Sequence, residues 1–168
     1  MNNLEREYRD RVHSFFRPYS DEAVIALRTI LSKSYAEDVA FLDFVMFAYD
    51  GFDDHMPIFT WPSTVENTVY TDIECPLAKI QTKPFKYYDE DIEDFVDIPW
   101  QLKDCAGRWL REAWKAAGGE LFHLPCYFTD HDDLESFSFI DNAWCENDPK
   151  QKRKANKWEQ ATPRKPSD

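Results

Sequence analysis

The densest group of side chains that could carry chemistry lies in the second half of the chain. His123, Cys126, His131 and Asp133 offer imidazole, thiolate and carboxylate groups, all of which bind zinc or iron in proteins. On an extended strand His123 and Cys126 would point to opposite faces, so binding one ion would require a bulge at Pro125. Cys126 and His131 could act as nucleophile and base only if the fold joined them. A small metal-dependent hydrolase is therefore one hypothesis.

Acidic side chains form the second candidate site. Carboxylate pairs can serve a glycosidase or bind Mg²⁺, but acidic runs are more often solvated loops. Large aromatic side chains beside acids are typical anchors of protein–protein interfaces. We therefore predict a partner-binding surface formed by Asp50, Asp53, Asp54, Tyr87, Tyr88, Asp89, Glu90, Asp91, Glu93 and Asp94.

Familiar catalytic signatures are missing from the sequence. It contains no HExxH, GxSxG, GxxxxGK[ST] or GxGxxG pattern, and its four glycines make a phosphate-binding loop improbable. The four cysteines are widely spaced without a CxxC pair, which favours free thiols in a reducing compartment. We expect a binding protein without a cofactor or metal, not an enzyme.

Charge is distributed unevenly along the 168 residues, whose formal net charge is −12. Residues 146–168 carry seven basic and four acidic side chains, so residues 1–145 carry 13 basic against 28 acidic ones, a net charge of −15. Such a field repels nucleic acid and anionic membranes and attracts basic partners, although it also serves solubility alone. The polar N-terminus has no signal-peptide pattern, and we expect a soluble cytoplasmic protein.

The positions of apolar residues predict the elements that hold these sites. Apolar side chains recur at steps of three and four from Leu4 to Phe16 and again from Val24 to Leu31, which predicts a helical hairpin that turns near Pro18. A third helix is predicted from Leu102 to Ala117, ended by Gly118 in the left-handed conformation.

Strands are predicted between and after these helices. The apolar run from residue 39 to residue 49 favours a strand buried on both faces. Shorter extended segments at 56–61 and 68–73, and a weaker one at 84–88, predict an antiparallel meander. The segment 121–128 is predicted to be one more strand, nearer an edge because of Pro125. The predicted class is α+β, with an antiparallel sheet of about four to six strands packed against the N-terminal helices and one helix of the C-terminal half.

The chain is predicted to form one domain, residues 1–145, followed by a basic and mobile tail, residues 146–168. The tail contains almost nothing to bury. It could instead fold back onto the acidic body, or contact RNA or a partner.

The segment from Trp114 to Glu120, followed by residues 121–127 and by His131 and Asp132, resembles the C-terminal part of small acidic bacterial proteins. Families of this kind include immunity proteins of polymorphic or contact-dependent toxin systems. The resemblance implies a cytoplasmic protein that blocks a cognate toxin, often a basic nuclease, with an acidic surface that substitutes for the nucleic-acid backbone. A DNA-mimic regulator that binds a restriction or repair enzyme is a further alternative with the same kind of surface.

Overall fold

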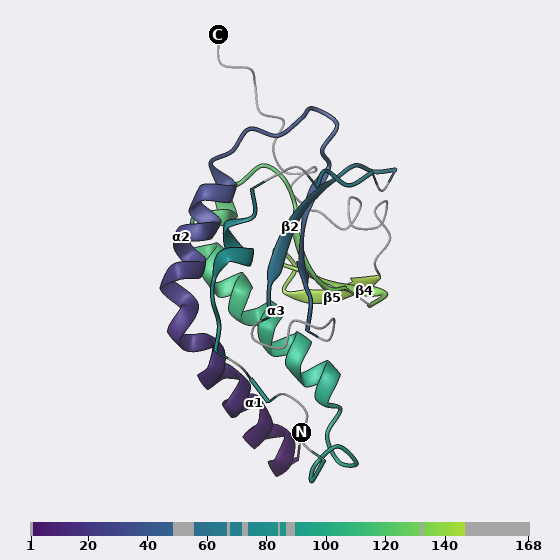
Figure 1. Cartoon of the computed structure of the whole chain (residues 1–168). Coiled ribbons are helices and arrows are strands. Elements are labelled where there is room, and N and C mark those ends of the chain that lie inside the picture. The colour runs from purple at the N-terminus through teal and green to yellow at the C-terminus, as the bar shows by residue number, and fades with distance from the viewer. Residues whose placement is uncertain are drawn as a thin grey trace.

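The computed structural model describes residues 2–48, 56–66, 68–71, 74–83, 85–86, 90–131 and 133–146 of the chain. In this part of the chain three helices lie on one side of a five-stranded sheet, so the class is α+β, as predicted (Figure 1). None of the helices in these ranges is long and apolar enough to span a membrane.

The first two helices form a single bent rod. α1 (Asn3–Phe16) passes through the 3₁₀ turn Arg17–Tyr19 into α2 (Ser20–Leu31), and the backbone is right-handed helical at Phe16, Arg17 and Ser20. Pro18 stands at the start of this turn, where a missing N–H costs little. The predicted hairpin is therefore wrong: the chain bends at Pro18 without reversing.

The rod runs parallel to the third helix, α3 (Ile98–Ala116). The contacts between the rod and α3 follow the same order along both segments. Arg9 donates a hydrogen bond to the Gln101 side chain, and further along Ser20 accepts one from the Trp109 indole. Arg28 of α2 bonds the carbonyl of Ala116 at the far end. Figure 1 shows the same arrangement, with the N-termini of α1 and α3 at one end of the molecule.

α3 confirms its sequence prediction and extends it by one turn. Asp97 caps the helix by accepting a hydrogen bond from the Trp100 amide at 3.1 Å. Pro99 occupies the first turn, where proline is tolerated. Gly118 follows the helix with φ of +91°, the left-handed conformation that the sequence predicts.

The sheet has the strand order β2-β1-β3-β4-β5. Its strands are β1 (Phe41–Met46), β2 (Ile58–Ser63), β3 (Cys126–Asp130), β4 (Glu135–Ser138) and β5 (Ala143–Glu146). Three of the neighbouring pairs are antiparallel, whereas β1 and β3 are parallel. The parallel pair requires a long crossover, and α3 lies within it.

Three strand predictions need correction. β3 is the middle strand of the sheet, not an edge, because Pro125 precedes it and contributes only its carbonyl, which accepts the Leu42 amide at 2.9 Å. The predicted strand at 68–73 is reduced to one bridge between Ser63 and Val69, with residues 72–73 outside the described ranges. Residues 85 and 86 of the predicted strand at 84–88 form no strand, and the rest of it lies outside the described ranges.

The main core lies between the helices and one face of the sheet. Leu42, Phe44 and Met46 of β1 point into it, together with Phe128 of β3 and Phe137 of β4. All five side chains are completely buried. Alternate residues of the same strands point to the opposite face, which no helix of the described ranges covers.

Candidate functional site

The proposed metal ligands lie far apart in the structure. Cys126 is buried at the start of β3 and faces the helices, whereas His131 follows the last residue of the same strand and is exposed. At about 3.3 Å per residue their Cα atoms are about 16 Å apart. His131 instead stacks on Phe47, with ring centroids 4.3 Å apart. These side chains therefore cannot bind one ion together.

The remaining candidate ligands are also separated. His123 lies before β3 in an exposed bend, and Asp133 pairs with Lys103 of α3. Burial raises the pKa of the Cys126 thiol, which favours the unreactive protonated form. Across the described residues no group of three His, Cys, Asp or Glu side chains is arranged to hold a metal ion.

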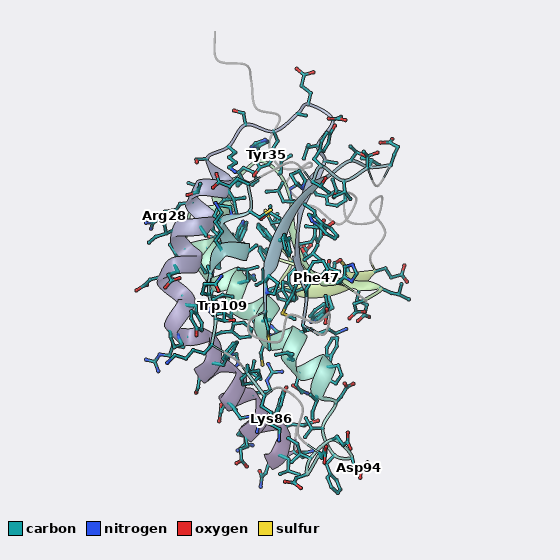
Figure 2. The ribbon with its side chains drawn as sticks, viewed as in Figure 1. Arg28, Tyr35, Phe47, Lys86, Asp94 and Trp109 are labelled. Carbon is teal, nitrogen blue, oxygen red and sulfur yellow. The ribbon has the colours of Figure 1, made fainter. Side chains whose placement is uncertain are left out.

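The acidic surface is described in part. Glu90, Asp91, Glu93 and Asp94 lie together in a series of turns before α3, and all four are exposed. Figure 2 places Asp94 at the end of the molecule where α1 begins. The other predicted members of the surface lie outside the described residues: Asp50, Asp53, Asp54, Tyr87, Tyr88 and Asp89.

Local packing holds this acidic segment in place. Val96 is buried and Ile92 packs against the core, while the amides of Phe95 and Val96 both donate to the Ile92 carbonyl at 2.9 and 3.0 Å. The Asn2 side chain donates to the Phe95 carbonyl at 3.1 Å, which ties the segment to the cap of α1. Hydrogen bonds and packing therefore fix the backbone of this segment between the N-terminal ends of α1 and α3.

Apolar side chains accompany the acids on this surface. Phe95 is 64% exposed, and Leu4 on the first turn of α1 is 37% exposed. The sequence indicated that the acidic run contains a few apolar residues, but not which of them point outward. Phe95 is thus an exposed aromatic side chain within the acidic run, whereas Tyr87 and Tyr88, the anchors that we predicted, lie outside the described residues.

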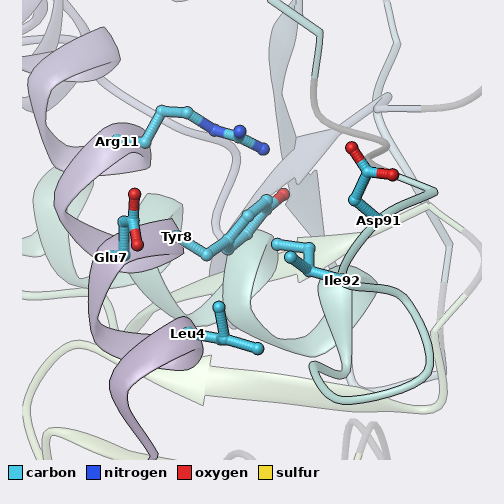
Figure 3. A pocket seen from close by; sticks show the side chains of 6 residues that line it. All are labelled: Leu4, Glu7, Tyr8, Arg11, Asp91 and Ile92. Atoms are coloured by element: carbon cyan, nitrogen blue, oxygen red, sulfur yellow. The ribbon is translucent and has the colours of Figure 1, made fainter.

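A pocket of about 350 Å³ lies between α1 and the acidic segment (Figure 3). The acidic segment contributes Asp91 and Ile92, and the helix contributes Leu4, Glu7, Tyr8 and Arg11. The Arg11 guanidinium lies 5.0 Å from the centre of the Tyr8 ring, and Figure 3 shows it facing the Asp91 carboxylate. The sequence placed Leu4 and Tyr8 on an apolar helix stripe, but their position opposite Asp91 depends on tertiary packing.

The electrostatics of the surface favour negative charge. Residues 89–97 contain six acidic side chains and no basic one. Both α1 and α3 present their N-terminal ends here, and the positive end of a helix dipole stabilises a nearby carboxylate by about 0.3–1 kcal/mol. The helix ends therefore offset part of the repulsion between these acids.

A buried ionic cluster behind the surface fixes α1 against α3. Asp104 lies 2.9 Å from the Arg9 guanidinium and 3.0 Å from that of Arg108, and it accepts the Trp144 indole N–H at 2.9 Å. Burial by itself raises the pKa of Asp104, but the hydrogen bonds from these three side chains outweigh it and hold the pKa below its usual value. Asp104 thus stays ionised and joins α1, α3 and β5.

Comparisons of the chain with protein-family models, with curated proteins and with solved structures find no match. The functional argument therefore depends on the physical features of the surface.

Proposed function

We propose that this protein binds and neutralises a cognate basic protein, a toxin, through the acidic segment at the N-terminal ends of α1 and α3. The observation that carries the proposal is the exposed Phe95 inside a run of exposed carboxylates that contains no basic residue. An aromatic anchor surrounded by charges of one sign fits a partner of the opposite sign.

Three features support a role in binding. The acids are held at two helix ends, which limits the conformational entropy lost when a partner binds. The adjacent pocket can receive a side chain of the partner beside Tyr8 and Asp91. The negative field of the body would also speed the encounter with a basic protein.

The test is capture of a partner by the full-length protein from extracts of its own cell, at low and at high salt. The variant Glu90→Gln, Asp91→Asn, Glu93→Gln, Asp94→Asn should capture much less of a basic protein that the unmodified chain retains at low salt. A matched control neutralises four exposed acids elsewhere, Glu22, Glu37, Glu66 and Glu120, each changed to Gln. The control should retain the partner, because only the total charge has changed.

The captured protein must then be tested for toxicity with and without this chain. Loss of toxicity in its presence would support neutralisation. Equal capture by the two variants would refute the assignment of the surface, and a restriction or repair enzyme as the captured protein would support the DNA-mimic alternative.

A further inference from the structure

The pocket between α1 and the acidic segment has walls of two kinds. The carboxylates of Glu7 and Asp91 line it, together with the apolar side chains of Leu4 and Ile92 and the ring of Tyr8. Carboxylates bind a cationic head group, and apolar walls suit the methylene groups that carry it. With a volume of about 350 Å³, the pocket is therefore suited to a long basic side chain.

Arg11 shows which cation fits this place. Its guanidinium lies 5.0 Å from the centre of the Tyr8 ring, within the range of a cation–π contact, and it faces the Asp91 carboxylate (Figure 3). Tyr8 is only 1% exposed, so another cation can reach its ring only where a covering side chain moves away. Arg11 is exposed on the helix and can turn toward the solvent.

We infer that this pocket binds a guanidinium group, that of an arginine side chain of the basic partner, in the place that Arg11 occupies. The assignment to a partner rests on the function proposed above, whereas the chemistry of the pocket does not. Exchange of one guanidinium for another keeps the cation over the Tyr8 ring and beside Asp91. The exposed acids Glu90, Glu93 and Asp94 belong to the same segment and attract a cation from solution.

The test uses two small probes on the full-length protein, without any partner. N-acetylarginine amide carries the guanidinium, and N-acetylcitrulline amide has the same length with a neutral urea head group. In an NMR titration the arginine probe should shift the amide signals of Tyr8 and Asp91 in a saturable way. The citrulline probe should leave them unchanged, because it cannot replace a cation.

Four variants locate the binding of the arginine probe. Asp91→Asn should weaken it several-fold, whereas Asp21→Asn neutralises an exposed acid of α2 and should leave it unchanged. Arg11→Ala should strengthen it several-fold, because the competing guanidinium is removed from the Tyr8 ring. Arg6→Ala removes the same charge from the same helix and should have little effect. Both control residues are exposed, and neither is among the described residues that line the pocket.

Equal shifts with the two probes would overturn the inference, since the unmodified pocket would then not select a cation. Equal affinities of Arg11→Ala and Arg6→Ala would overturn the exchange with Arg11. The result is also separable from that of the partner capture. Binding of the arginine probe without capture of a basic protein would support the pocket and contradict the proposed neutralisation, whereas capture without any binding of the probe would contradict the pocket alone.

Discussion

At the scale of single residues, the most consequential side chain outside the proposed surface is Asp104. The periodicity of α3 places it next to the apolar stripe, and only its spacing from Arg108, four residues on, indicates a partner. Its contacts with Arg9 and Trp144 come from distant parts of the sequence. The sequence therefore could not predict that one carboxylate joins three elements.

Asp104→Ala should lower the free energy of unfolding by about 3 kcal/mol, because Arg9 and the Trp144 indole would lose their shared acceptor in a largely buried site. Urea denaturation measures the change. Asp94→Ala removes an exposed acid and should change the free energy by no more than about 0.5 kcal/mol. Equal effects of the two substitutions would show that the Asp104 cluster does not stabilise the fold.

Asp104 also gives the stability a defined pH dependence. The pKa of Asp104 in the folded protein lies below 3.8, the ordinary value that it regains on unfolding. Its contribution to the free energy of unfolding is therefore complete when the pH is above 3.8. The contribution is lost as the pH falls below 3.8 toward the folded pKa. The stability difference between the unmodified protein and Asp104→Asn should therefore shrink from about pH 5 to about pH 2. A difference that stays constant over this range would contradict the assignment.

At the scale of elements, the two glycines after α3 have different roles. Gly118 needs the left-handed conformation but has open space around its Cα, whereas a Cβ on Gly119 would overlap the indole of Trp114. Trp114 is only 2% exposed and has little room to move.

Gly118→Asn should therefore cost less than Gly118→Ala, since asparagine tolerates the left-handed conformation and alanine loses about 1–2 kcal/mol there. Gly119→Ala should cost about 1–3 kcal/mol through overpacking. Thermal or urea unfolding of the three variants gives the comparison. An asparagine at 118 as costly as alanine would argue against a conformational role.

The elements also show how far the sequence predicts this fold. α3 was predictable because its apolar stripe and its terminal glycine are local signals, whereas its start at Ile98 and its cap, Asp97, were missed. β4 and β5 were not predicted, since each has only four residues. In β4, moreover, Ser136 is a polar side chain that is buried, where it shares a hydrogen bond of 2.7 Å with Thr129. The central position of β3 was missed because it depends on pairing with β1, far away in the sequence.

The candidate site likewise combines features that the sequence predicts with features that depend on tertiary packing. The acids from Glu90 to Asp94 were recognised from the sequence as a charge run, and their exposure follows from it. The pocket with Tyr8 and Arg11, and the outward position of Phe95, depend on packing between α1 and residues 90–97.

At the scale of the whole molecule, the net charge and the arrangement of the helices together determine where a basic partner should approach. Residues 1–145 carry a net charge of −15, and the parallel course of α1 and α3 places two helix N-terminal ends beside the densest acids. The exposed acids Glu90, Asp91, Glu93 and Asp94 place negative charge at this end of the protein, and the partial positive charge of the helix ends offsets only part of it. A basic partner should therefore approach that end fastest, and its association should slow as salt screens the charges.

The most direct test of this account is the association rate constant of the captured partner, measured at low and physiological ionic strength. For the unmodified chain the rate should fall steeply with salt. The variant neutralised at Glu90, Asp91, Glu93 and Asp94 should bind at least about tenfold more slowly at low salt, with a weaker salt dependence, while the control neutralised at four other acids stays close to the unmodified chain. Equal rates and equal salt dependence for the two variants would contradict the claim that this acidic surface is the binding site.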